Sequence, residues 1–269
     1  MNRYQPIRDD KPAPPRAAWL FIVLSGFVAQ APAADLPAGN CRKPAAGTDL
    51  SRCDFTRQKL AGLDLRGARF AGAKLESADF RKARLEDADF RDSNAKWANF
   101  TGARLNRADL GKADLFHATF DDADLSDARL VGVNLFGANL INTKAQRADL
   151  SGAYLKDILM EGIDLSGGSI KGCYTFRGVM TDAKMVGTDL SEADLTGAAA
   201  ENVDFSGARL LGTKLLGATL RHAVFMSADM AGADLANADV WNANFDGARN
   251  RPDSVQDALI EPFVARERR

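Results

Sequence analysis

Histidine, cysteine and aromatic residues are scarce in this sequence, and neither sign of charge is in clear excess. Its 269 residues include 2 His and 3 Cys, aromatic residues make up 8%, and the formal net charge is −1. A balanced charge argues against the strongly basic surface with which proteins hold nucleic acid. No nucleophile with a placed base, phosphate-binding glycine loop or Cys-x-x-Cys motif is present. We therefore expect no enzyme activity, cofactor, metal site, nucleic-acid partner or small-molecule ligand.

Long apolar runs are also rare, and the clearest one lies near the N-terminus. Basic residues precede the apolar run 17–28, and small residues follow it at 29–35. This order is typical of a secretory signal, and the run falls short of the roughly 20 residues that span a bilayer. We predict a signal segment over residues 1–33, cleavage near Ala33 or Ala34, and an exported protein, periplasmic or secreted, without a stable membrane span. The alternative is an uncleaved membrane anchor.

What the sequence has in abundance is a five-residue repeat. From Leu50 to Phe245, every fifth residue belongs to a series of 40 positions, of which 21 are Leu, nine Phe and four Met. The residue two places earlier is Ala at 25 of these positions. No insertion or deletion interrupts the count. Such a strict period indicates a repeat architecture.

Neither a helix nor a long strand can place this series on one side. Five residues turn a helix by about 140°, which scatters the large residues around the axis. Five residues along a strand reverse the face, because the side-chain period is two. The chain must therefore turn a corner in every repeat, and residues such as Gly67 and Gly152 suit these corners.

The repeats resemble those of the pentapeptide-repeat family, whose motif is A(D/N)LXX. Segments 108–112 (ADLGK) and 148–152 (ADLSG) match it. The resemblance implies an all-β fold, a right-handed quadrilateral β-helix with four pentapeptides per coil and about ten coils. The large residue and the small one before it then face inward, and positions 20 apart stack.

The resemblance and the flanking sequence together divide the chain. We predict an N-terminal cap segment at 34–49, the solenoid at 50–248, and a C-terminal cap helix and tail at 249–269. Asp253 and Gln256 resemble an N-cap and its partner, opening a short helix through Ile260 that covers the end of the core. The alternative for this end is a frayed tail.

Cysteine usage fits an exported protein. Cys41 and Cys53 lie twelve residues apart at the start of the repeats. Since disulfides persist outside the cytosol, we expect these two to pair and fasten the cap, leaving Cys173 free. The alternative is three unpaired thiols.

Within the repeats, two kinds of irregularity stand out. Small residues replace the large one at Ala95, Ala145, Thr175 and Ala200. The segment 156–188 keeps the count but carries unusual residues at the small position, namely Ile158, Ile163, Gly168 and Cys173.

The outward positions are mostly charged, and stacking by 20 interleaves the two signs, as at Asp49, Arg69 and Asp89. His117 and His222 fall about five coils apart and cannot form one site. We interpret the acidic group at 121–127 as a solvated corner rather than a cation site.

One wall of the predicted solenoid departs from this polar pattern. A contiguous apolar stripe on a rigid rod marks a contact surface, unless a loop, the signal-proximal segment or the C-terminal tail covers it. The candidate interaction surface consists of Trp97, Phe116, Phe136, Tyr154, Leu159, Tyr174, Phe176, Val179 and Leu216.

The leading functional hypothesis is a non-catalytic exported scaffold that binds a protein partner or itself. One alternative comes from the resemblance, since some pentapeptide-repeat proteins mimic DNA and bind DNA gyrase. Removing residues 1–33 takes away four basic and two acidic side chains, so the charge becomes only −3, too little for a mimic of nucleic acid. A second alternative is an enzyme or ligand-binding solenoid that uses segment 156–188.

Overall fold

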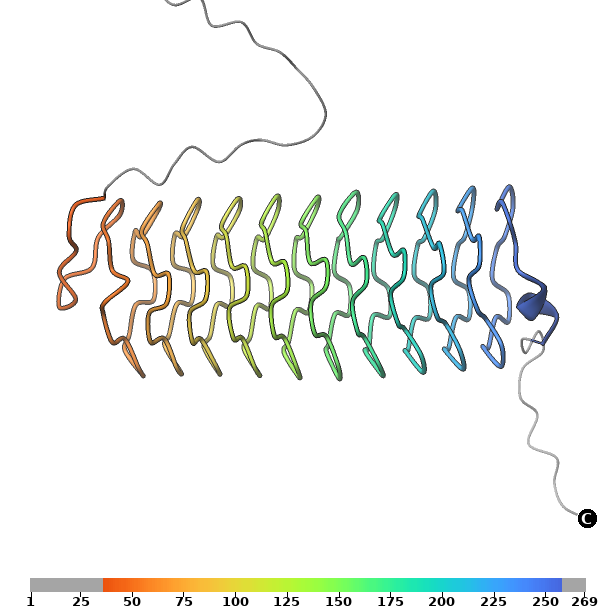
Figure 1. Ribbon diagram of the computed structural model, residues 1–269, viewed down its shortest axis with the longest axis horizontal. Coiled ribbons are helices and arrows are strands. Elements are labelled where there is room, and N and C mark those ends of the chain that lie inside the picture. The colour runs from red at the N-terminus through yellow and green to blue at the C-terminus, as the bar shows by residue number, and fades with distance from the viewer. Residues whose placement is uncertain (1–35, 258–269) are drawn as a thin grey trace, which may run out of the picture. The chain divides into compact units, whose positions relative to one another are not determined.

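The computed structural model describes residues 36–257, which form one continuous stack of coils (Figure 1). The predicted signal segment and its cleavage site lie outside these residues, as does the chain after Asp257. Within residues 36–257, no helix combines the length and the apolar character that crossing a membrane takes.

Each coil contains 20 residues. Parallel β-bridges join residues 20 apart, as in Asp64↔Arg84 and Arg84↔Arg104, and one such series runs from Asp49 to Arg249 in ten steps. Bridges recur every five residues along the chain, so each coil has four faces. The predicted all-β class is thus confirmed, but the β-structure in this range consists of isolated bridges between turns rather than extended strands.

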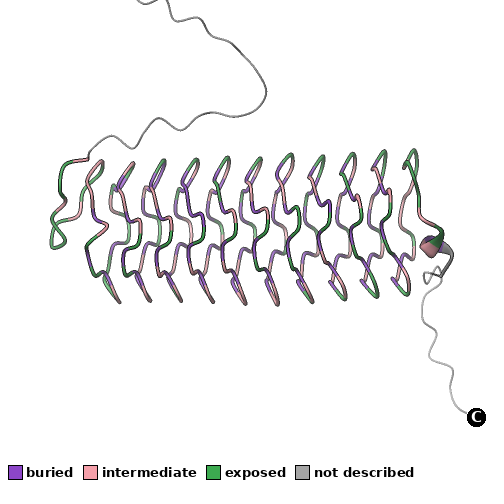
Figure 2. Ribbon diagram, in the orientation of Figure 1, coloured by how far each residue is buried: buried purple, intermediate pink, exposed green. Residues whose placement is uncertain are grey.

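The core is a column of the large and small repeat residues. Leu105, Phe100 and Ala103 are at most 1% exposed, and the same holds for nearly all equivalent positions. Buried and exposed residues therefore alternate within every coil, as Figure 2 shows. The predicted inward set is confirmed. The exceptions lie at the two ends, which no further coil covers: Ala243 and Phe245 are only partly buried, and Gln58 in the first coil is exposed.

The corners are tight turns with a recurring backbone geometry. The Ala73 N–H donates to the Phe70 carbonyl oxygen at 2.8 Å, and φ at the intervening Gly72 is 68°. A bond from the fourth to the first residue with positive φ at the third is the pattern of a type II turn. Arg57 adopts φ of 58° at an equivalent corner, although a side chain makes this conformation costly by about 1 kcal/mol.

The Asp or Asn that precedes the large residue in many repeats accepts a hydrogen bond from the backbone at the next corner. A side-chain oxygen of Asp204 accepts a hydrogen bond from the Ser206 N–H at 2.9 Å, and Asp149 does the same for Ser151. The bond satisfies a backbone donor that the corner leaves free. This geometry explains why the residue before the large one is so often Asp or Asn.

Segment 156–188 follows the regular coil because neighbouring residues accommodate its unusual inward side chains. A Cβ atom on Gly178 would lie 2.9 Å from Cγ2 of Thr175 and 3.2 Å from Cγ2 of Ile158. Glycine thus leaves room for both Thr175 and Ile158, which is larger than the usual Ala. The Cys173 thiol donates to the Leu150 carbonyl oxygen at 2.9 Å, in the way that Thr188 donates to Leu165.

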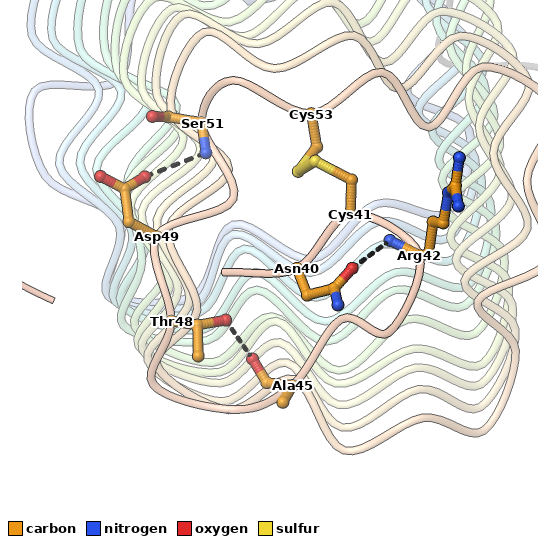
Figure 3. The surroundings of a disulfide bond; sticks show 8 residues. All are labelled: Asn40, Cys41, Arg42, Ala45, Thr48, Asp49, Ser51 and Cys53. Carbon is orange, nitrogen blue, oxygen red and sulfur yellow. Dashed lines mark hydrogen bonds between the residues drawn. A yellow bond between two sulfur atoms is a disulfide. The ribbon is translucent and has the colours of Figure 1, made fainter. Parts of the chain in front are cut away.

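At each end of the stack, a segment that is not a pentapeptide coil packs against the last layer of the core. At the N-terminal end, Cys41 and Cys53 form the predicted disulfide, which joins the cap loop to the first coil (Figure 3). At the other end, a 3-10 helix, η1 (Asp253–Asp257), stands where a short helix was predicted. Val255 in it is 5% exposed and packs on the core, while the predicted continuation through Ile260 lies outside the described range.

Candidate interaction surface

The candidate metal-binding and nucleophilic side chains of residues 36–257 are dispersed or already bonded. No group of three or more His, Cys, Asp or Glu side chains in this range is placed to hold a metal ion. In the acidic group at 121–127, Asp127 accepts two hydrogen bonds of 2.6 Å from Arg147, which lower its pKa. Burial raises the pKa of the free Cys173 thiol to about 12, so this cysteine is unsuited to act as a nucleophile.

Six aromatic residues on the candidate wall form a continuous series of ring contacts, which we call the aromatic ribbon. The ring centroids are 5.5, 5.3, 6.1, 5.6 and 6.1 Å apart in succession. The first contact is edge-to-face and the other four are stacked. In order, the aromatic ribbon consists of Trp97, Phe116, Phe136, Tyr154, Tyr174 and Phe176.

The repeat geometry brings these rings together from different positions of the pentapeptide. Phe116, Phe136 and Phe176 occupy the corner position that follows the large residue, in coils 20 or 40 residues apart. Tyr154 and Tyr174 occupy the bridging position before it and form a β-bridge with each other. The ribbon therefore follows one edge of the solenoid along its axis.

The aromatic ribbon faces solvent despite its apolar character. Trp97 is 49% exposed, Tyr154 41% and Tyr174 38%. The three phenylalanines are half-buried, since each stacks on its neighbours. Burying such rings against another surface removes a large apolar area from water.

Two residues belong to this surface that the sequence analysis did not include. The His117 ring lies 4.3 Å from that of Phe116, and its Nδ1 is 3.1 Å from the Gly137 carbonyl oxygen. Gly137 permits this, because a Cβ atom there would lie 2.5 Å from the imidazole. Lys156 places its ammonium group 5.7 Å from the Phe136 ring centroid. Lys156 lies 20 residues from both Phe136 and Phe176, and this spacing could have identified it from the sequence.

The remaining members of the predicted surface are not in the ring series. Leu159 and Val179 form a β-bridge around the next corner and are half-buried. Leu216 is 40% exposed but lies two coils beyond Phe176, with Thr196 at the position between them.

Charges beside the aromatic ribbon are mostly paired. Lys96 lies 3.1 Å from Asp114, and Arg177 lies 3.9 Å from Asp157. Lys156 makes no ion pair with any residue of the described range. The ribbon thus carries one unpaired positive charge near its middle.

Elsewhere the walls carry interleaved charges. Asp109 is 6% exposed and lies between Arg91 at 3.8 Å and Arg129 at 3.4 Å. Arg69 similarly lies between Asp49 at 3.5 Å and Asp89 at 3.9 Å. In both ladders acidic and basic side chains alternate, so neither presents a continuous row of carboxylates.

The sequence of the solenoid matches a known family of repeats. The model of pentapeptide repeats matches eight times, at residues 48–87, 69–107, 83–122, 96–132, 118–157, 128–167, 179–210 and 204–242. The unmatched gap at 168–178 falls in the irregular segment. No curated protein sequence gives a significant match.

Several solved structures are similar to this chain. HetL, a pentapeptide repeat protein involved in heterocyst differentiation regulation in the cyanobacterium Nostoc, is 30% identical, with 77% of this chain and 87% of HetL covered and a TM-score of 0.41. QnrB1, a plasmid-mediated fluoroquinolone resistance protein, is 21% identical over 69% of this chain and 90% of its own, with a TM-score of 0.29. Rfr23 from the cyanobacterium Cyanothece is 22% identical over 49% and 91%, with a TM-score of 0.21.

Proposed function

The chain belongs to the pentapeptide-repeat family, and we propose that it is an exported, non-catalytic scaffold that binds a protein partner through its aromatic ribbon. A solenoid of this family offers a long rigid surface built from short repeats. Function therefore resides in what that surface displays.

The observation that carries the proposal is the exposed aromatic ribbon itself. Trp97, Tyr154 and Tyr174 remain 38–49% exposed, although polar residues occupy most equivalent outward positions. Exposed aromatic anchors are costly in water and are the residues that dominate binding energy when an interface buries them. The solenoid holds them rigidly, so little ordering entropy opposes binding.

The charge on the aromatic ribbon favours a different protein over a second copy of this chain. A twofold axis through the middle of the ribbon would bring the unpaired Lys156 close to its own copy. Like charges within an apolar contact oppose association. A partner that offers a carboxylate among apolar side chains would instead pair with Lys156.

Export is supported by the disulfide. Cys41 and Cys53 are within bonding reach with a Cα–Cα distance of 5.4 Å, and such bonds persist in oxidising compartments. The basic and apolar order of residues 1–33 agrees with this compartment. The two observations are independent.

The alternatives have less support. Interleaved ion pairs and a charge of −3 without residues 1–33 argue against a gyrase-binding mimic of DNA. Segment 156–188 follows the same coil path as its neighbours, and its unusual residues Ile158, Ile163 and Cys173 face the core. We therefore propose neither a gyrase-binding mimic of DNA nor an enzyme.

The test replaces the exposed tyrosines and compares them with a matched pair on the opposite face. Tyr154→Ser with Tyr174→Ser should abolish capture of a discrete envelope protein and leave the melting temperature within about 2 °C. Lys144→Ser with Lys184→Ser is the control, because both lysines are exposed at bridging positions. Sedimentation of the purified proteins reports self-association. Equal capture by both double variants would overturn the proposal.

A further inference from the structure

A second surface feature lies at the N-terminal end of the stack, away from the aromatic ribbon. A pocket of about 420 Å³ opens between the cap loop and the first coil. Its apolar lining consists of the partly exposed Leu63 and of Phe55 and Leu60, which are nearly buried beneath it. This volume lies within the range of roughly 300–1,000 Å³ that small-molecule sites occupy.

The pocket exists because the cap does not complete a coil. Asp49 is bridged both to Ala38 in the cap and to Arg69 in the following coil, whereas Asp54, Lys59 and Asp64 are bridged only to the following coil. Three faces of the first coil therefore lack the preceding layer that each later coil has. Leu63, at a position that is usually Ala, is only partly buried at this end.

The cap loop that borders the pocket is held in place. The disulfide fastens it at Cys41, and the Gly39 N–H donates to the Asp49 carbonyl oxygen at 2.8 Å. The Lys43 N–H donates to the Asn40 carbonyl oxygen at 2.9 Å. Figure 3 shows Arg42 directly after the disulfide, with its backbone N–H bonded to the Asn40 side chain. The border of the pocket is thus preorganised.

The border is positively charged. Arg42, Lys43 and Lys59 line the pocket, are exposed, and make no ion pair with the residues that the structure describes. The lining carboxylate, Asp54, is already engaged, since it lies 3.6 Å from Lys74 and accepts the Thr56 N–H at 3.0 Å. The surplus charge of the pocket is therefore cationic.

We infer that this pocket binds a small amphipathic anion, with the apolar part against Phe55, Leu60 and Leu63 and the carboxylate or sulfate beside Arg42, Lys43 and Lys59. Apolar walls with a few convergent charged groups are the usual composition of a ligand site. An inorganic anion would leave the apolar floor unused, and a neutral apolar ligand would leave the three cations unpaired. The inference replaces our sequence-based expectation that no small molecule binds.

Decanoate, used below its micelle concentration, is a suitable probe, and its binding to the exported protein is followed through the methyl resonances of Leu60 and Leu63. We expect saturable shifts of these methyl groups and weaker binding of the uncharged decan-1-ol. Replacing Arg42, Lys43 and Lys59 together by Gln should weaken decanoate binding roughly tenfold, because three exposed ion pairs contribute modestly. The control replaces Lys144, Lys171 and Lys184 by Gln and should bind like wild type.

Several results would overturn the inference. Unshifted Leu60 and Leu63 methyl groups, or equal decanoate affinity in both triple variants, would show that no such site exists. Shifts of Leu63 that depend on protein concentration alone would mean that a second copy occupies the pocket. Tyr154→Ser with Tyr174→Ser should leave decanoate binding unchanged, so failure here and failure of the proposed scaffold function are distinguishable.

Discussion

The phenylalanine column at the N-terminal half of the core offers a graded test of the packing. Phe100 is fully buried, and its ring stacks on Phe80 at 5.0 Å and Phe120 at 4.7 Å. It also contacts Phe90 edge-to-face at 5.8 Å. Phe100→Ala removes all three ring contacts and leaves a void that the rigid coils cannot close. We expect a loss of about 3–5 kcal/mol in the free energy of unfolding.

Phe100→Leu is the informative companion variant. Leucine already occupies the same stacking position in other coils, at Leu60, Leu140 and Leu220. We therefore expect Phe100→Leu to cost less than about 1.5 kcal/mol, since most of the volume is retained. The exposed Lys112→Ala serves as control and should change stability by less than about 0.5 kcal/mol.

Urea unfolding followed by far-UV circular dichroism measures these differences. The account predicts the order Lys112→Ala, Phe100→Leu, Phe100→Ala in increasing destabilisation. Equal losses for the two Phe100 variants, or a loss below about 1 kcal/mol for Phe100→Ala, would refute the stacked-core reasoning.

Three further predictions concern charge, the cap and the irregular segment. A side-chain hydrogen bond from Arg66 lowers the pKa of Asp64 from 3.8 to about 2. A carboxyl group whose pKa is lower in the folded than in the unfolded state stabilises the fold at pH values above its unfolded pKa. The urea midpoint should therefore stay constant above about pH 4 and fall between about pH 4 and 2; a rise on acidification would contradict this. Reduction of the Cys41–Cys53 disulfide should lower cap stability by about 3 kcal/mol, measured as faster amide exchange confined to residues 39–49; uniform acceleration along the solenoid would count against a local cap. Gly178→Ala should cost about 1–3 kcal/mol, and the double variant Gly178→Ala with Ile158→Ala should lose less stability than the sum of the two single losses; strictly additive costs in the double-mutant cycle would disprove the compensation.

The coil was predictable because its period leaves few alternatives. A large residue at every fifth position cannot face one side of a helix or a strand, so the chain must turn regularly. The same count assigns each residue to the core or to a wall, and the burial of Phe100, Ala103 and Leu105 follows it. The disulfide was predictable for a simpler reason, since Cys41 and Cys53 bracket the entry to the first coil.

Features that depend on side-chain conformation were harder to predict. The sequence places Asp49 in a ladder of surface charges, whereas its side chain also accepts a hydrogen bond from the Ser51 N–H, and predicting that role requires knowing which backbone donors a corner leaves free. The wall bearing Tyr154 was predicted, but Leu216 does not join its ring contacts and Lys156 does. The 20-residue spacing predicts which residues share an edge of the solenoid, but side-chain rotamers determine which of them are in contact.

The central claim is that the aromatic ribbon is the face that binds a protein partner. Site-specific photo-crosslinking in living cells tests it directly, with a benzophenone side chain placed at Tyr154 or at the control position Lys184 on the opposite face. Both positions are exposed and lie in β-bridges of the same kind. The account predicts one discrete crosslinked protein from position 154 and none from position 184. Crosslinks of equal yield and identity at both positions, or none at position 154, would contradict it.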